Sequence, residues 1–336
     1  MRIAVDANGA DLGPAEVAAG AAIAAAQGVT PVLFGPAAEI GAVPDGVEVV
    51  DAPVSIAKAA EPVTAVRQTP GASIVQAARA VAAGDCQAFV AGGTTGAALA
   101  AGLFNIKRSP GIYRPALAVP LPVPGNPVTL VDVGANAECR PEHLVQFAHM
   151  GAALVQVVLG IEQPRVGLLN NGEEAVKGTP LYREAHALLA RSDGLNFVGN
   201  VDGNHVVDGQ ADVVVADGFT GNITLKLIEG VSQMVIGAIR ERASSSPRAK
   251  AGGLLLRPAL RAFRDEIDPE GPGGAGLLGL RKRGVVPHGR FTRCGISQAI
   301  LLAARGASGG VVARTHGALE RAGALRSSPA ASVPSA

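Results

Sequence analysis

The 336-residue sequence contains no tryptophan, two tyrosines and eight phenylalanines, so aromatic side chains supply little of its core. Its large apolar contacts must come from valine, leucine and isoleucine, because alanine inflates the hydrophobic fraction of 48%. Only three cysteines occur, Cys86, Cys139 and Cys294, and none belongs to a CxxC pair. This scarcity argues against a disulfide framework and a cysteine-based zinc cluster, and it favours a reducing cytoplasm.

Long hydrophobic runs are also missing. The longest one, at 18–26, is too short and too rich in alanine to span a bilayer. The first residues lead into a strand-like segment rather than the apolar region of a signal peptide, so we expect a cytoplasmic location. The length allows a large core, built as one α/β domain or as two closely packed lobes.

The sequence has almost no excess of charge of either sign, since the net charge is +1, and this argues against a general attraction to nucleic acid. Two segments are nevertheless basic. Segment 240–264 has seven arginines and lysines against one acid, and segment 281–293 has five basic residues and no acid. The first of these predicts a contact with an acidic partner protein or a membrane surface. A solvated basic face, packed on the protein's own core or on a dimer mate, explains it equally well.

Short apolar runs alternate with longer helical stretches along most of the chain. The runs are apolar throughout rather than alternating with polar residues, as expected for a sheet that is covered on both faces. The pattern therefore predicts an α/β fold with a mainly parallel sheet and helices on both faces. Strands are predicted at 2–7, 30–35, 47–52, 86–92, 115–121, 128–134, 165–170, 195–201 and 211–218.

The C-terminal third contains a predicted break in helical structure. A long helix is predicted from near Thr220, and the Ser/Pro/Gly-rich stretch SSSPRAKAGG ends it. We predict a flexible basic excursion at 244–258 within a single catalytic domain that covers 1–324. The remaining residues, 325–336, have no periodicity and are predicted to be a disordered tail.

In an open parallel sheet, ligands bind beyond the carboxyl ends of the strands. Six loops after predicted strands are rich in Gly, Asn, Asp or Thr. Any one of these loops could equally be an ordinary turn, but six together favour a site for phosphate or carboxylate along one edge of the sheet. Glycine lets a ligand approach the backbone, and helix N-termini offer free N–H groups to an anion. The loops read DANGADLGP, AGGTTGA, DVGANAECRPEH, LNNGEEAVKG, VGNVDGN and ADGFTGN.

Several familiar motifs are present in form only. The GxGxxG match at 274–279 follows a Pro/Gly loop and has no acidic partner before Glu320, and no P-loop occurs. The GxSxG match at 306–310 precedes a strand-like GGVVA, whereas a nucleophile elbow needs the strand before it, so we predict a turn. Cys139 and His143 are too few for a metal site, and an exposed histidine at a helix start is the favoured interpretation. No metal, nucleotide or other cofactor is predicted.

Four segments occur in an order that resembles the phosphate acyltransferase family of bacterial phospholipid synthesis. The similarity is close from about residue 130 to 230 and looser up to about 305. It implies transfer of a fatty acyl group from acyl carrier protein to inorganic phosphate, in a homodimer that associates loosely with the membrane. It also implies a fold similar to phosphotransacetylases and to isocitrate and isopropylmalate dehydrogenases. The segments are DVGANAECRPEHLVQFAHMG, VGLLNNGEEAVKG, NFVGNVDG and DVVVADGFTGNITLK.

The chain departs from that family's pattern in four places. Asp11 is kept, but Leu12 stands where the family has histidine. Segment 91–94 has alanine and threonine in place of serine and asparagine, and segment 288–291 reads His-Gly-Arg-Phe in place of His-Gly-Ser-Ser. Residues 306–324 have no counterpart that we can align. These changes bear on activity and substrate more than on fold.

Lys177 and Asp217 match the two proposed catalytic residues of the family. A lysine suits phosphate or a developing oxyanion as a point charge, and an aspartate accepts a proton from phosphate or orients it. Taken alone, the sequence allows a solvent-facing lysine and an N-capping aspartate instead. We expect Glu173 or Glu174 to hold the lysine or to cap a helix. Further candidates for substrate and phosphate binding are Asp11, Thr94, Thr95, Gly96, Asn136, Asn170, Glu173, Asn222 and His288.

Two alternatives remain open from the sequence. One is a phosphotransacetylase-like enzyme that uses acyl-coenzyme A and needs no carrier protein. The other is a catalytically weakened relative that binds acyl carrier protein or membrane as a scaffold. The change at Leu12 and the altered loop at 288–291 favour this alternative. A decarboxylating dehydrogenase is disfavoured, because the strand ends lack the clustered aspartates that a divalent metal requires.

Overall fold

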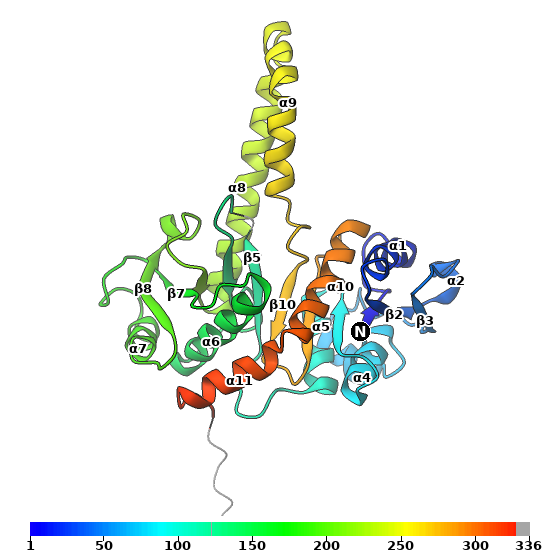
Figure 1. Cartoon of the computed structure of the whole chain (residues 1–336), viewed down its shortest axis with the longest axis horizontal. Helices are drawn as coiled ribbons and strands as arrows, with labels where there is room; N and C mark the ends of the chain where they lie inside the picture. The colour runs from blue at the N-terminus through cyan, green and yellow to red at the C-terminus, as the bar shows by residue number, and fades with distance from the viewer. Residues whose placement is uncertain (122, 327–336) are drawn as a thin grey trace, which may run out of the picture.

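The computed structural model describes residues 1–121 and 123–326. Its body is an eleven-stranded mixed sheet with helices on both faces, and a two-helix arm projects from it (Figure 1). The strand order is β3-β2-β1-β4-β11-β10-β5-β6-β9-β7-β8. The strands are β1 Arg2–Asp6, β2 Thr30–Gly35, β3 Glu48–Asp51, β4 Ala88–Ala91, β5 Ala116–Leu121, β6 Val128–Val131, β7 Arg165–Asn170, β8 Asn196–Asp202, β9 Val213–Val215, β10 Ala275–Leu278 and β11 Arg283–Val286.

The helices alternate with the strands along most of the chain. They are α1 Pro14–Ala25, α2 Ala37–Ile40, α3 Pro62–Gln68, α4 Ser73–Ala83, α5 Thr95–Ala101, α6 Pro141–Val158, α7 Pro180–Leu189, α8 Gly218–Ser244, α9 Pro247–Glu266, α10 Arg293–Ser308 and α11 Val311–Arg321, with a π-helical turn η1 Gly102–Ile106 and a 3₁₀ turn η2 Gly203–His205. The predicted fold class is thereby confirmed. All nine predicted strands are present, and most of their apolar runs are buried in the sheet, the exceptions being the edge strands β3 and β8.

Two strands and one helix differ from the prediction. β10 and β11 were not predicted, since each has four residues and β10 lies within the glycine-rich segment of the GxGxxG match. The strand-like GGVVA begins α11 instead, with Val311 buried against the body. Ser308 ends α10 before a glycine turn, as predicted.

The direction of the strands reverses in the middle of the sheet. The β11/β10, β10/β5 and β5/β6 pairs are antiparallel, so the parallel group β6-β9-β7-β8 runs against the parallel group β3-β2-β1-β4-β11. The sheet is mainly parallel, as predicted, but the loops after its strands do not form the expected single row along one edge. Neighbouring strands twist by about 20–25° each, and the eight steps from β1 to β8 add up to about 160–200°.

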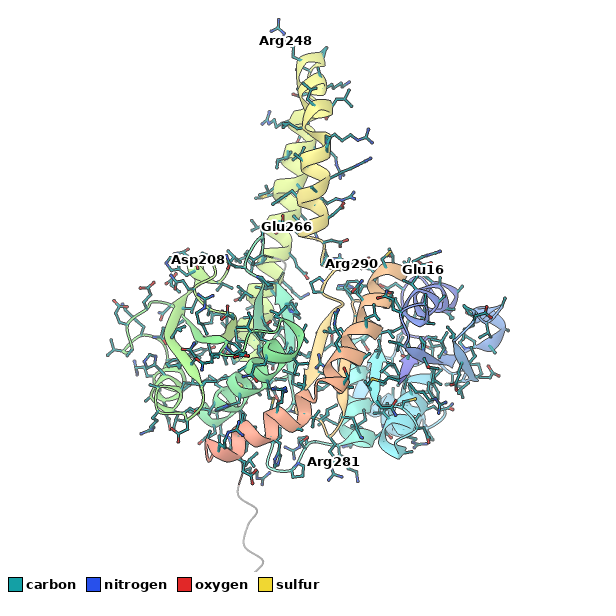
Figure 2. All side chains as sticks on the ribbon, viewed as in Figure 1. Glu16, Asp208, Arg248, Glu266, Arg281 and Arg290 are labelled. Atoms are coloured by element: carbon teal, nitrogen blue, oxygen red, sulfur yellow. The ribbon has the colours of Figure 1, made fainter. Side chains whose placement is uncertain are left out.

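This twist turns the carboxyl ends of β1, β11 and β8 toward the same side of the body. Figure 2 shows Glu16 after β1, Asp208 after β8 and Arg290 after β11 on the side from which the arm rises, with Arg281 on the opposite side. Two groups of loops therefore replace the expected single row, and the loops of Asp208 and Arg290, one from each group, lie on the side from which the arm rises.

Helices α8 and α9 form the arm. α8 starts in the body, and α9 returns antiparallel to it after a turn at 245–246 (Figure 1). In place of the predicted excursion at 244–258, the chain forms the end of α8, this turn and the first half of α9. The Ser-Pro sequence explains this, because Ser246 Oγ accepts the N–H of Ala249 at 3.1 Å and Pro247 occupies the first helical position.

Among the described residues, no single helix is long and apolar enough to cross a bilayer. The pair α10 and α11 reaches the required length and composition only together, with a bend of 49° between them. The predicted tail at 325–336 lies outside the described residues from 327 onward.

Candidate functional site

The buried carboxylate of Asp132 organises the loop after β6. Its Oδ1 accepts the backbone N–H groups of Leu117 at 2.9 Å and Ala135 at 3.1 Å, and its Oδ2 accepts the N–H of Asn136 at 2.8 Å. Burial raises the pKa of Asp132, and these hydrogen bonds oppose the shift. The carboxylate thereby fixes residues 132–136 in one conformation.

The first turn of α8 is built against this loop. The N–H of Gly218 donates to the carbonyl oxygen of Asn136 at 2.7 Å. A Cβ at Gly221 would lie 1.9 Å from the carbonyl oxygen of Asp132, so only glycine fits there. The N-terminus of α8, which carries a partial positive charge, is therefore held at the carboxyl ends of β6 and β9.

Asp217 caps this helix end. It is 7% exposed, and its Oδ1 accepts the N–H of Thr220 at 2.9 Å, which is the N-cap that the sequence allowed. Its Oδ2 accepts the hydroxyl of Thr220 at 2.8 Å and the hydroxyl of Tyr182 at 2.6 Å. Burial, and then the bond to Asp217, raise the pKa of Tyr182, so the phenol remains a donor. Three hydrogen bonds thus hold the carboxylate in one orientation.

The loop 171–179, here the lysine loop, carries Lys177 with a 46% exposed side chain. Asn170 closes the loop, because its Nδ2 donates to the carbonyl oxygen of Lys177 at 3.3 Å and its Oδ1 accepts the N–H of Asn171 at 2.9 Å. Lys177 Nζ lies 4.0 Å from Glu174 Oε2, as expected for one of the two glutamates. An exposed pair of this kind contributes at most about 1 kcal/mol, so an incoming anion can compete for the ammonium group.

Glu173 makes a different contact. Its Oε1 lies 3.6 Å from His205 Nε2, and His205 Nδ1 contacts Asp208. The hydrogen bond to Asp208 raises the pKa of His205, and the charge of Glu173 adds to this. A second tether is the hydrogen bond from Asn200 Nδ2 to the carbonyl oxygen of Glu174 at 2.8 Å. Glu173, which is predicted to bind substrate, ties the lysine loop to the loop after β8 in this structure.

Tyr182 joins the lysine loop to Asp217. A Cβ at Gly178, which has φ +86°, would lie 2.9 Å from the Cβ of Tyr182, so the end of the lysine loop packs on the first turn of α7. β7 and β9 are neighbours in the sheet, so the loops after them are neighbours too. Lys177 and Asp217 therefore lie on adjoining loops beside the N-terminus of α8. Both belong to the first group of loops, which follows β6, β7, β8 and β9.

Two asparagines of this group donate inside the protein. Asn136 Nδ2 donates to the carbonyl oxygen of Pro115 at 2.7 Å and to Asp132 Oδ2 at 2.9 Å, which uses both of its hydrogens. Asn222 Nδ2 donates to the carbonyl oxygen of Val133 at 3.0 Å. In this structure Asn136 positions the loop after β6, contrary to its predicted role as a free donor.

Other predicted residues lie in the second group of loops, after β1, β4 and β11. The N–H of Asp11 donates to the carbonyl oxygen of Gly289 at 2.8 Å, which brings it to the loop of His288. Burial and then the charge of Arg290 lower the pKa of His288, and Glu229 on α8 opposes the shift. α8 therefore passes close to the second group after starting at the first.

The turn at 94–96, with the exposed residues Thr94, Thr95 and Gly96, starts α5 in this second group. Beneath it lies the buried carboxylate of Asp6, whose Oδ1 accepts the hydroxyl of Ser73 at 2.7 Å. Burial raises the pKa of Asp6 to about 6. Within residues 1–121 and 123–326, no hydrogen bond joins this turn to the lysine loop, and the two belong to different groups of loops.

Sequence reasoning missed Asp132 and Tyr182. Asp132 directly follows an apolar strand, which is the position of a buried carboxylate. Tyr182 lies three and seven residues before Ala185 and Leu189, on the buried face of α7, where a phenol needs a partner. These sequence positions indicate a buried carboxylate and a buried phenol, but the residues that each one contacts depend on the tertiary fold.

Cys139 and His143 do not form a reactive or metal-binding pair. Burial, and then the charges of Asp132 and Asp217, raise the pKa of the Cys139 thiol to about 12. His143 is buried rather than exposed, and its Nδ1 accepts the N–H of Arg140 at 3.2 Å at the start of α6. Across the described ranges, no three His, Cys, Asp or Glu side chains are placed to hold a metal ion.

Known proteins are similar to this chain over most of its length. A family model described as fatty acid synthesis protein matches residues 1–314. The phosphate acyltransferase of Lacticaseibacillus casei is 46% identical over 86% of this chain and 87% of that protein. The phosphate acyltransferase of Pelotomaculum thermopropionicum is 41% identical over 90% of both.

Solved structures share the fold at low sequence identity. A phosphotransacetylase from Streptococcus pyogenes has a TM-score of 0.59 at 18% identity, covering 90% of this chain and 93% of that one. The EutD phosphotransacetylase from Staphylococcus aureus has a TM-score of 0.58 at 16% identity, covering 91% and 94%. The predicted likeness to phosphotransacetylases is thus confirmed for the fold.

Proposed function

Because the chain belongs to the fatty acid synthesis protein family, with phosphate acyltransferases as relatives, we propose that it transfers a fatty acyl group from acyl carrier protein to inorganic phosphate. The observation that carries this proposal is the assembly of Lys177 and Asp217 on adjoining loops at the N-terminus of α8. A helix N-terminus with an adjacent, half-exposed ammonium group suits a phosphate dianion.

The chemistry requires charge stabilisation and no cofactor. A phosphate oxygen attacks the thioester carbonyl carbon, a C–O bond forms, and the carbonyl oxygen becomes an oxyanion. The C–S bond then breaks, and the thiolate leaves with the bonding pair and takes up a proton. Thioester and acyl phosphate are both activated, so the exchange needs no ATP.

Each residue of the assembly has a role in this scheme. Lys177 neutralises the charge of phosphate or of the oxyanion after its ammonium group has moved away from Glu174. Asp217 accepts a proton from monoanionic phosphate or orients it, and Tyr182 and Thr220 fix its rotamer.

We propose that the acidic acyl carrier protein docks on the basic arm. Segment 240–264 exposes its arginines together with apolar residues of α9, such as Leu254 and Leu255. The same combination suits a peripheral contact with an anionic membrane. For the membrane contact, sedimentation with anionic vesicles is expected, with weaker binding to neutral vesicles and in a Leu255→Glu variant. Equal binding to both vesicle types would remove the electrostatic part of this proposal.

The enzymatic proposal is tested with purified protein, acyl carrier protein charged with a long acyl chain, and radiolabelled phosphate, with hydroxylamine trapping of acyl phosphate. Lys177→Ala and Asp217→Asn are expected to lower kcat by about 100- to 1,000-fold, since each removes a preorganised polar group. The exposed Lys282→Ala, next to Arg281 on the side of the body opposite the arm, is the control and retains activity.

Two other outcomes would decide for the alternatives. Turnover with acetyl-coenzyme A and none with the carrier protein would identify a phosphotransacetylase-like enzyme, the activity named for the structural neighbours. Tight binding of the carrier protein without any acyl phosphate would identify a scaffold.

A further inference from the structure

Arg283, the first residue of β11, is a buried cation that the proposed reaction does not use. It is 2% exposed, and its Nε, Nη1 and Nη2 atoms have no hydrogen-bond partner within residues 1–121 and 123–326. None of the ion pairs in these ranges includes it. Burial lowers the pKa of Arg283 to about 10, so the guanidinium is still charged at neutral pH. A buried charge of this kind is costly unless a partner balances it.

Two glycines make room for this guanidinium. A Cβ at Gly276, on the neighbouring strand β10, would lie 2.6 Å from Nη2, and a Cβ at Gly306, in α10, would lie 2.7 Å from Nε. Gly276 belongs to the GxGxxG match and Gly306 to the GxSxG match, neither of which the proposed reaction uses. The side chain of Arg283 therefore lies between the sheet and α10, in a space that depends on both glycines.

Arg283 and Gly276 line a small cavity between the sheet and the helices α6 and α10. Thr129, on β6, is the other residue of the lining with a polar side chain, and it is 2% exposed. The rest of the lining comes from apolar residues of β5, α6 and α10. The cavity, of about 10 Å³, has room for one particle of about the size of a water molecule. An organic ligand is too large for it.

We propose that this cavity binds one small monovalent inorganic anion, such as chloride, between the guanidinium of Arg283 and the hydroxyl of Thr129. Hydrogen bonds from a charged donor to an anion are stronger than those between neutral groups. A water molecule would accept a hydrogen bond but would leave the charge unbalanced. The C-terminal end of α10, near Gly306, offsets only about half an elementary charge. The anion stabilises the body of the protein and takes no part in the proposed reaction.

Thermal unfolding in sodium chloride and in sodium gluconate of equal ionic strength tests the proposal, because gluconate is too large for the cavity. We expect the Tm of the wild type to be about 2–4 °C higher in chloride, and the effect to saturate as one site fills. Arg283→Met removes the charge and Gly276→Ala displaces Nη2, so both variants should lose the difference. Arg248→Met, exposed at the tip of the arm (Figure 2), is the matched control and keeps it. An equal chloride effect in the wild type and in Arg283→Met, or no effect in the wild type, overturns the proposal.

A crystal of the wild type soaked in sodium bromide gives a test that does not depend on the folding of any variant. We expect an anomalous bromide peak within hydrogen-bond distance of the Arg283 guanidinium and the Thr129 hydroxyl. Electron density for water in the cavity, without an anomalous signal, contradicts the proposal. A bromide peak in a protein whose Tm does not respond to chloride would mean an adventitious ion only, and this outcome also contradicts the proposal.

Discussion

The hydroxyl of Tyr182 is a single group whose removal tests the proposed chemistry. Tyr182→Phe removes only this donor to Asp217 Oδ2, while the ring still fills its buried position. A hydrogen bond to a charged group contributes about 1.5–3 kcal/mol, so we expect a loss of stability of that size and a kcat about tenfold lower. Urea denaturation and steady-state kinetics measure the two effects.

The only other tyrosine is the control for this experiment. Tyr113 lies beside His143 and Arg140, and Tyr113→Phe should leave both stability and kcat close to those of the wild type. Equal effects of the two substitutions would contradict a specific role for Tyr182.

Asp6 makes the stability depend on pH. Its folded-state pKa of about 6 lies above the ordinary value of 3.8 for an aspartate, so the folded chain holds this proton more tightly than the unfolded chain. The contribution is therefore fully present below about pH 4 and is lost as the pH rises through about 6. Asp6→Asn abolishes this dependence, so relative to the wild type the variant should gain on the order of 3 kcal/mol between pH 4 and pH 7.

Denaturation curves at the two pH values measure this difference, and subtraction of the wild-type curve cancels the other titrating groups. The exposed Asp45→Asn is the matched control and should show no such gain. A constant difference between Asp6→Asn and the wild type from pH 4 to pH 7 would show that folding does not raise the pKa of Asp6.

At the residue scale, local contacts were predictable and long-range contacts were not. The pairing of Lys177 with Glu174 and the capping by Asp217 follow from spacings of three residues or fewer. The bond between Tyr182 and Asp217 spans 35 residues and depends on β7 lying beside β9, which no local pattern specifies.

At the scale of elements, the start of α8 depends on a glycine. Gly221→Ala would place a Cβ 1.9 Å from the carbonyl oxygen of Asp132, so the helix start must move away from the loop after β6. We expect a loss of at least about 2 kcal/mol in stability, as for other overpacked positions, together with lower kcat.

A second glycine of α8 provides a control with the opposite sign. At Gly230 a new Cβ meets nothing within 4 Å, so Gly230→Ala should stabilise the protein by about 0.5–1 kcal/mol through helix propensity alone. Thermal unfolding of both variants checks the pair. A Gly221→Ala protein as stable as Gly230→Ala would show that α8 does not pack closely on Asp132.

Element prediction succeeded where a long apolar run decided the structure. It failed at β10 and β11, which are four residues each and rich in glycine or flanked by charge, and at α11, whose Gly-Gly-Val-Val start has strand propensity. Tertiary packing of Val311 and Leu319 overrides that preference.

At the scale of the whole molecule, the sequence predicted a mainly parallel sheet and missed the reversal within it. Apolar strand patterns show that a strand is buried, but they do not show the direction of its neighbours. The three antiparallel pairings and the accumulated twist decide which loops meet, and these are properties of the complete sheet.

The arm favours the homodimer that the sequence resemblance implies. α9 has no buried residue, and Met234 and Leu227 on α8 are 65% and 64% exposed. Two helices that project from a body cannot bury such residues against each other alone, whereas the hairpin of a second copy would complete a four-helix bundle. Met234→Glu should therefore convert a dimer into a monomer, as measured by sedimentation equilibrium. Val43→Glu, at an exposed apolar position of the body, should leave the dimer intact. A monomeric wild type would contradict the homodimer, and a Met234→Glu variant that stays dimeric would place the partner contact elsewhere than on this face of the arm.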